Sequence, residues 1–214
     1  MVIAAGTSSP PIRVLIVDDH AVVREGIAAL LGRQPDMVAV GEAADGIEAI
    51  ARFVELAPDV TLMDMQMDGM GGVEAIEKIR GLSSDARILV LTTYPGDAQV
   101  VRALRAGAAG YLLKNCIRKE LLDAIRQVHV GRCAMSPDIA HDLAVHALDE
   151  PLTERELTIL RFVADGHPNK EIASHLELST DTIKAHLKSI FAKLGVGDRT
   201  EAVTVAARRG FIER

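Results

Sequence analysis

The sequence predicts two domains of different class: an open α/β unit with five parallel strands, followed by an all-α unit of four helices. From Ile12 to about residue 131, short apolar runs alternate with longer stretches of helical period. This is the pattern of parallel strands joined by crossover helices. From residue 151 onward every segment has helical period. A chain of 214 residues also suits two compact units with separate cores.

The strands expected in the first unit, residues 12–131, lack strict polar alternation, as strands covered on both faces should. They are Arg13 to Val17, Val38 to Glu42, Val60 to Met63, Ile88 to Leu91 and Gly110 to Leu113. The helices expected between them span residues 20–33, 46–57, 71–80, 97–107 and 118–130. The fold class is therefore α/β with a doubly wound sheet, preceded by a flexible extension over residues 1–11.

A partly helical linker is expected over residues 132–150, and the helical unit over residues 151–214. The linker helix should span 137–148. Thr153 and Glu156 form a capping-box signature that begins the next helix, and Gly166 can end it as a left-handed cap. Three further helices are expected, from Asn169 to Leu176, from about Thr180 to Leu194 and from Thr200 to Arg209, with a tight turn through Glu177 and Leu178.

Composition limits the possible functions. The net charge of -6 is unevenly distributed: residues 1–150 have 14 basic and 21 acidic side chains, and residues 151–214 have 10 and 9. The first unit can therefore hold a cation, while the second can concentrate positive charge on one face. Two cysteines fit a reduced, cytoplasmic chain, and there is neither a signal-peptide pattern nor an apolar run long enough for a membrane helix. With 3% aromatic residues, a base-stacking surface is not expected.

Carboxylates gather at the predicted carboxyl ends of the strands, where functional groups collect in open α/β sheets. Asp18 and Asp19 follow the first strand, and Asp64 ends the third. Three such carboxylates need a hard cation such as Mg²⁺. Thr92 and Lys114, after the fourth and fifth strands, add a hydroxyl and an ammonium. Together these groups have the parts needed to attach a phosphoryl group to Asp64.

These segments resemble the receiver domain of two-component systems. The matching stretches are Val14-Leu15-Ile16-Val17-Asp18-Asp19-His20, Leu62-Met63-Asp64-Met65-Gln66-Met67, Leu91-Thr92-Thr93-Tyr94 and Gly110-Tyr111-Leu112-Leu113-Lys114. The resemblance implies a flavodoxin-like fold with strand order 2-1-3-4-5. It also implies that a histidine kinase phosphorylates Asp64.

The resemblance further implies roles for individual residues. Asp19, Asp64 and the backbone carbonyl of Gln66 would bind Mg²⁺ directly, and Asp18 would assist. Thr92 and Lys114 would hold the phosphoryl group. Tyr111 occupies the position of an aromatic switch residue, which fills the space that the moving threonine leaves; by itself, a half-buried tyrosine on a strand is an equally good interpretation.

Three further positions lie in or near the predicted pocket. Receivers usually have proline four residues after the phosphorylated aspartate, and Asp68 stands there instead, which changes the loop and adds a charge. Pro95-Gly96 is an unusual lead into the fourth helix. His20 is expected to be structural or an outer neighbour of the acidic pair, because no other histidine or cysteine lies at ligand spacing.

The helix from Thr180 carries one apolar stripe. Opposite it lie the small residues Ala185, Ser189 and Ala192 beside Lys188, with Asp181 on the same face and Lys184 at the flank. Such a face suits the major groove of DNA, and the preceding short helix and turn complete a helix-turn-helix. Residues 151–214 resemble the LuxR-type domain of NarL/FixJ response regulators. The matching stretches are Leu152-Thr153-Glu154-Arg155-Glu156, Asn169-Lys170-Glu171-Ile172-Ala173, Thr182-Ile183-Lys184-Ala185-His186-Leu187-Lys188 and Lys193-Leu194-Gly195-Val196.

By this likeness, bases are contacted by Lys184, Ala185 and Lys188, and the phosphate backbone by Lys170, Thr180 and Thr182. The last helix would pair two copies on DNA. His167-Pro168 departs from the small polar residues usual at the entry of the second helix.

The sequence thus predicts a DNA-binding transcription regulator that phosphorylation of Asp64 activates, with promoter DNA and a second copy of the chain as partners. An alternative keeps DNA binding but uses an unphosphorylated receiver for dimerisation or ligand sensing, and Asp68 is its support. An enzyme is not expected. An aspartyl phosphatase needs a carboxylate where Gln66 stands, and Asp18 and Asp19 would repel a flavin phosphate.

Overall fold

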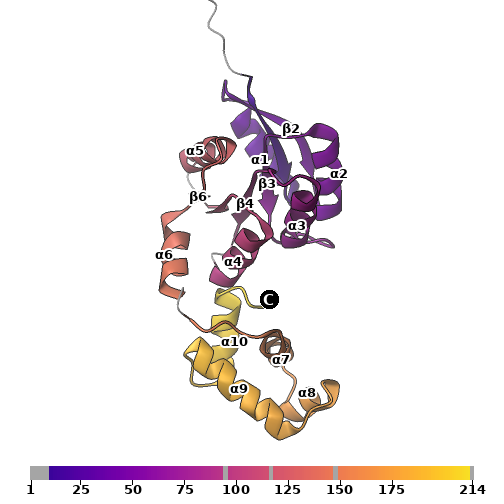
Figure 1. Cartoon of the computed structure of the whole chain (residues 1–214), viewed down its shortest axis with the longest axis vertical. Coiled ribbons are helices and arrows are strands. Elements are labelled where there is room, and N and C mark those ends of the chain that lie inside the picture. The colour runs from indigo at the N-terminus through magenta and orange to yellow at the C-terminus, as the bar shows by residue number, and fades with distance from the viewer. Residues whose placement is uncertain (1–9, 94–95, 116–117, 147–148, 213–214) are drawn as a thin grey trace, which may run out of the picture. The chain divides into compact units, whose positions relative to one another are not determined.

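A computed structural model describes residues 10–93, 96–115, 118–146 and 149–212 (Figure 1). Most of the expected N-terminal extension, Pro95, Cys116 and the end of the expected linker helix lie outside the described residues. The described chain divides into two compact units. One contains residues 10–93 and 102–139, and the other contains residues 96–101 and 140–212. Among the described residues, no helix is long and apolar enough to cross a membrane.

The strands and helices of the α/β part alternate as predicted. The strands are β1 Ile12–Val17, β2 Met37–Ala43, β3 Val60–Asp64, β4 Ile88–Thr92, β5 Gly110–Leu113 and β6 Ala134–Met135. The helices are α1 Ala21–Leu31, α2 Gly46–Leu56, α3 Gly72–Leu82, α4 Asp97–Ala106 and α5 Arg118–His129, and α6 Pro137–His146 follows β6.

The sheet is parallel, and its order is β2-β1-β3-β4-β5-β6. The first five strands confirm the predicted order, but the expected count of five was wrong. The sixth strand, Ala134–Met135, pairs with Gly110 and Tyr111 and lies in the expected linker. Two residues are too few to show a period in sequence, so only the neighbouring strand β5 reveals this one.

The sheet is covered on both faces, as its apolar strands require. Alternate residues of β1 face opposite ways, and Val14 and Ile16 join a core with Leu31 of α1 and Ile125 of α5. Figure 1 shows α5 on one side of the sheet and α2 and α3 on the other. Burial on both faces fixes the strands, so the residues at their carboxyl ends are held in place by the core.

The helical unit contains α7 Glu154–Ala164, α8 Asn169–His175, α9 Thr180–Leu194 and α10 Arg199–Arg208. The capping box predicted at α7 is present, and Gly166 takes the left-handed conformation expected after that helix, with φ 88°. The apolar stripe of α9 packs into one core with α7, α8 and α10. The turn between α8 and α9 passes through Glu177, whose φ of 53° is left-handed.

Candidate functional site

The acidic pocket forms where β1 and β3 end side by side. Asp18 follows β1 directly, Asp64 is the last residue of β3, and the two strands pair through Val17 and Met63. Both carboxylates are almost fully buried, at 1% and 3% exposure. Lys114, just after β5, places its Nζ 2.7 Å from the Oδ2 atom of each. The structure therefore brings together three of the predicted residues, with the carboxylates of Asp18 and Asp64 both at the Lys114 ammonium.

Burial and Lys114 shift the pKa of the Asp64 carboxyl in opposite directions. Removal from water disfavours the ionised form and raises the pKa of the Asp64 carboxyl, and the hydrogen bond from Lys114 offsets this only in part. Burial would likewise lower the pKa of Lys114, but its hydrogen bonds with Asp18 and Asp64 outweigh burial and raise it. Lys114 stays charged as a result, and an additional cation would further favour the carboxylate form of Asp64.

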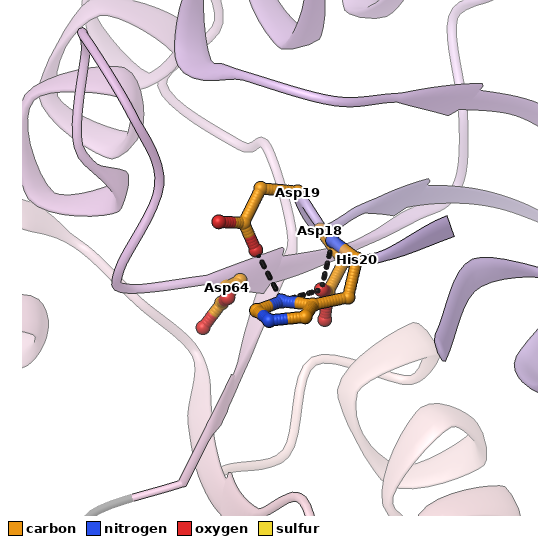
Figure 2. A group of neighbouring side chains, drawn as sticks. All are labelled: Asp18, Asp19, His20 and Asp64. Atoms are coloured by element: carbon orange, nitrogen blue, oxygen red, sulfur yellow. Dashed lines mark hydrogen bonds and ion pairs between the residues drawn. The ribbon is translucent and has the colours of Figure 1, made fainter. Parts of the chain in front are cut away.

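The donor atoms fit a divalent cation. Figure 2 shows Asp18, Asp19, His20 and Asp64 gathered at one point, and one ligand atom from each lies within 4.8 Å of the others. Lys114 pairs with the Oδ2 atoms of Asp18 and Asp64, and each Oδ1 atom faces one backbone N–H, so a lone pair on each Oδ1 remains for another ligand. Asp19 completes the set with a side chain that is 31% exposed. His20 contacts the carboxylates of Asp18 and Asp19 through Nδ1, and its expected role as an outer neighbour of this acidic pair stays a prediction.

Thr92 and Tyr111 lie beside the pocket on neighbouring strands. Thr92 ends β4, is 1% exposed, and its backbone carbonyl accepts a hydrogen bond from the Lys114 amide at 2.6 Å. Tyr111 is fully buried on β5. Burial raises the pKa of its hydroxyl to about 12, although the nearby Thr92 side chain lowers it in part. The phenol is thus neutral, and it sits inside the protein next to the predicted switch threonine.

The loop after β3 contains a feature that sequence reasoning missed. Asp68 is exposed, and the chain turns at Gly69 with a φ of 78°. Farther on, a Cβ at Gly72 would lie 2.2 Å from the carbonyl oxygen of Asp64. The first residue of α3 therefore packs directly on the backbone of Asp64, and only glycine allows this approach. The Gly71-Gly72 pair at the start of the helix was the available signal.

Gln66 lies at the start of the same loop. Its backbone N–H points to Asp64 Oδ1 at 3.4 Å. The expected role of its carbonyl as a metal ligand stays a prediction.

The second candidate surface is the helix-turn-helix of α8 and α9. Lys184, Ala185 and Lys188 are exposed on α9, and Lys170 is exposed on α8. Thr180 and Thr182 are half-buried at the start of α9. The hydroxyl of Thr182 lies 2.8 Å from that of Ser179, the residue that caps the helix. Lys184 pairs with Asp181 at 2.9 Å, but both side chains are exposed, so the pair is weak and open to exchange.

A buried glutamate fixes α9 against α7, a function that the sequence did not reveal. Glu156 accepts hydrogen bonds from the Thr153 amide at 2.8 Å, Ser189 Oγ at 2.6 Å and Lys193 Nζ at 2.9 Å. Burial alone would raise the pKa of this carboxyl, but these bonds outweigh it and lower the pKa to about 2. Ser189 therefore faces α7, although the helical pattern placed it on the open face of α9.

Comparison with known proteins agrees with this geometry in both units. Residues 14–126 match the response regulator receiver domain, and residues 150–206 match the bacterial regulatory proteins of the luxR family. The chain is 43% identical over 209 residues to the transcriptional regulatory protein LiaR of Bacillus subtilis, covering 94% of this chain and 99% of LiaR. The chain belongs to the response regulator family. It has a receiver domain and a LuxR-type DNA-binding domain.

This response regulator is also 42% identical over 207 residues to the response regulator protein VraR of Staphylococcus aureus, covering 94% of the chain and 99% of VraR. Its fold matches RcsB of Salmonella enterica serovar Typhimurium bound to a promoter in the presence of the phosphomimetic BeF3-, with a TM-score of 0.72, 28% identity, and 92% and 98% of the two chains covered. LiaR and VraR are named as regulators rather than enzymes.

Proposed function

We propose that this response regulator is switched by phosphorylation of Asp64 and binds promoter DNA as a homodimer when phosphorylated. The receiver would span residues 12–131 and the DNA-binding domain residues 151–214, joined by the linker between them. The observation that carries the proposal is the position of Lys114 Nζ, 2.7 Å from both Asp18 and Asp64. A buried carboxylate with a fixed ammonium beside it can accept a phosphoryl group and pair with its oxygens.

Phosphoryl transfer would take place between a partner histidine kinase and Asp64. A carboxylate oxygen of Asp64 attacks the phosphorus of a phosphohistidine on a partner histidine kinase. The new O–P bond forms as the P–N bond breaks, and the leaving imidazole takes up a proton. Lys114 pairs with the phosphoryl oxygens and Thr92 donates a hydrogen bond to one of them. Asp18, Asp19, Asp64 and the carbonyl of Gln66 would hold Mg²⁺, which offsets negative charge on the transferring oxygens.

The switch would connect Thr92 with Tyr111. When Thr92 turns toward the phosphoryl group, the Tyr111 ring, which is already buried, would fill the space that Thr92 leaves. Phosphorylation would thereby stabilise the buried position of the Tyr111 ring. Homodimerisation and promoter binding would follow from that population shift. Solved structures of RcsB include dimers bound to DNA, which supports the same arrangement for this chain.

The DNA contact would be made by α9 in the major groove. Lys184, Ala185 and Lys188 are exposed and would face bases, while Lys170, Thr180 and Thr182 would contact phosphates. We expect Lys188→Ala to weaken binding by roughly tenfold, since one base or phosphate contact is worth about 1–3 kcal/mol. Lys78→Ala, which removes an exposed lysine of α3, is the matched control and should leave DNA affinity unchanged.

The test of phosphorylation uses the full-length protein with Mg²⁺ and acetyl phosphate. Intact-mass spectrometry should show one labile phosphoryl adduct, and Asp64→Ala should abolish it. Asp68→Asn changes an exposed carboxylate of the next loop and should retain the adduct. Light scattering should show dimers only when the adduct is present. Phosphorylation should also raise the affinity of the protein for those genomic fragments that the phosphorylated protein selects.

An unphosphorylated pseudo-receiver is the alternative that Asp68 supports. If no adduct forms and DNA affinity is the same with and without phosphodonor, this alternative replaces the proposal.

A further inference from the structure

The first helix of the helix-turn-helix, α8, is too short to be stable by itself. It has seven residues, and isolated helices shorter than about 12 residues are marginal in water. Its N-cap is Pro168, which makes no side-chain cap bond. The position of Lys170, the exposed lysine of its first turn, is therefore set by the contacts that other segments make with the start of α8.

Arg199, the first residue of α10, makes one of these contacts. Its Nη2 atom donates to the carbonyl of His167 at 2.7 Å and to the carbonyl of Val163 at 3.1 Å. Val163 lies in the last turn of α7, and His167 directly precedes the N-cap of α8. Both bonds are partly buried, and a bond from a charged donor is roughly twice as strong as a neutral one. One side chain of α10 thus ties the end of α7 to the entry of α8.

The His167 side chain packs at the same junction between α7 and α8. Its ring lies edge-on to Phe162 of α7, with the ring centroids 5.5 Å apart. Phe162 also stacks on His175, the last residue of α8, at 5.3 Å. The Nδ1 atom of His167 lies 3.1 Å from Glu171 Oε2 in the first turn of α8. His167-Pro168, which departs from the small polar residues usual at this entry, therefore forms a packed junction.

We propose that Arg199 is a positioning residue for DNA binding, which keeps Lys170 within reach of the phosphate backbone without contacting DNA itself. The inference rests on the proposed function, because it requires that α8 lies against DNA. Lys170 is three residues beyond His167, whose carbonyl Arg199 holds. Without that bond the short helix can tilt, and the tilt displaces the lysine ammonium, which extends from the helix surface. The ammonium then loses its phosphate contact.

The salt dependence of DNA binding distinguishes positioning from a loss of stability. Fluorescence anisotropy over a salt series would measure the affinity of the full-length protein, treated with acetyl phosphate and Mg²⁺, for a duplex of mixed sequence. Each phosphate contact contributes about 0.9 to the slope of log affinity against log salt. We expect Arg199→Gln and Lys170→Ala each to lower the affinity by about tenfold and the slope by about 0.9. A variant that merely unfolds part of the protein would lower the affinity at an unchanged slope, which would overturn the proposal.

The double variant separates positioning from direct contact. If Arg199 acts through Lys170, Arg199→Gln changes neither the affinity nor the slope further in the Lys170→Ala background. If Arg199 itself contacts a phosphate, the losses add to about 100-fold in affinity and about 1.8 in slope, and the proposal is wrong. Arg161→Gln removes the same charge from an exposed position of α7 and is the matched control, which should leave the slope unchanged.

Urea denaturation shows whether each variant is folded. If Arg199→Gln is not, Arg199→Lys takes its place in the same cycle, because lysine keeps the charge and can still donate to a carbonyl from a shorter side chain. Arg199→Lys should lower the affinity by about threefold and have no effect in the Lys170→Ala background. A loss that persists in that background would refute the positioning role.

The single variants separate this inference from the proposed function. If Lys170→Ala leaves the affinity and the slope of the wild type unchanged, α8 does not contact DNA, and the proposed DNA surface fails together with the role of Arg199. If Lys170→Ala has the expected effect but Arg199→Gln is neutral, or additive with it, only the role of Arg199 is wrong.

Discussion

The stability of the helical unit depends on the ionised carboxylate of Glu156. This side chain is 4% exposed and links the start of α7 to Ser189 and Lys193 of α9. We predict that Glu156→Gln loosens the packing of α9 on α7. Glutamine keeps the shape but loses the charge. It has one carbonyl oxygen where glutamate has two carboxylate oxygens, so its NH2 group takes one of the two positions that accept hydrogen bonds from Thr153, Lys193 and Ser189.

The magnitude follows from the pKa of Glu156, which falls from an ordinary 4.5 to about 2. Each pKa unit corresponds to about 1.4 kcal/mol, so full conversion gives roughly 3 kcal/mol in favour of the folded carboxylate. Solvent near Lys193 screens part of this. We therefore expect the substitution to cost about 2 kcal/mol of local unfolding free energy, equivalent to a roughly 30-fold faster amide exchange.

Hydrogen exchange with mass spectrometry on the full chain measures this directly. Peptides of α7 and α9 should exchange faster in Glu156→Gln at about pH 7, while receiver peptides are unchanged. Glu171→Gln removes an exposed glutamate of α8, with 59% of its side chain exposed, and should have an effect below about 0.5 kcal/mol. Equal exchange of α7 and α9 in the wild type and in Glu156→Gln would refute the reasoning.

The same residue predicts a pH dependence with a definite sign. The pKa of Glu156 is lower in the folded state, so its contribution is fully present above about pH 4.5 and is lost as the pH falls toward about 2. The difference in protection between wild type and Glu156→Gln, corrected for intrinsic exchange, should therefore shrink over that interval. A difference that grows on acidification would contradict the assigned direction.

Three further predictions concern the α/β unit. Gly72→Ala places a Cβ 2.2 Å from the Asp64 carbonyl oxygen, so it should lower the free energy of unfolding by roughly 2 kcal/mol and slow labelling by acetyl phosphate. Gly81→Ala, the control in the same helix, meets nothing within 4 Å and should be neutral or stabilising in calorimetry. Lys114→Met leaves Asp64 without its ammonium, so labelling should slow by roughly 100-fold in a mass-spectrometric time course; unchanged kinetics would exclude phosphoryl contact. Asp45→Ala removes the two cap bonds of α2 and should cost about 1 kcal/mol in urea denaturation.

The sequence by itself determined most of the architecture. Largely apolar runs of four or five residues predict parallel strands because a strand covered on both faces has no polar side, and five of the six strands of the described sheet were predictable on this basis. The cap of α7 and the left-handed Gly166 follow from backbone chemistry local to each residue. Asp18, Asp64 and Lys114 could be placed at one edge because parallel strands end together.

Tertiary structure decided what depends on residues far apart in the chain. β6 exists because β5 offers a free edge, and a two-residue strand carries no period of its own. Gly72 is required by the Asp64 carbonyl, and Ser189 turns to Glu156 from 33 residues away. His20 contacts both carboxylates of the acidic pair through its ring, a contact that the sequence could not place. Local sequence sets backbone conformation, whereas ligand sets and buried hydrogen bonds arise only when packing brings distant side chains within contact distance.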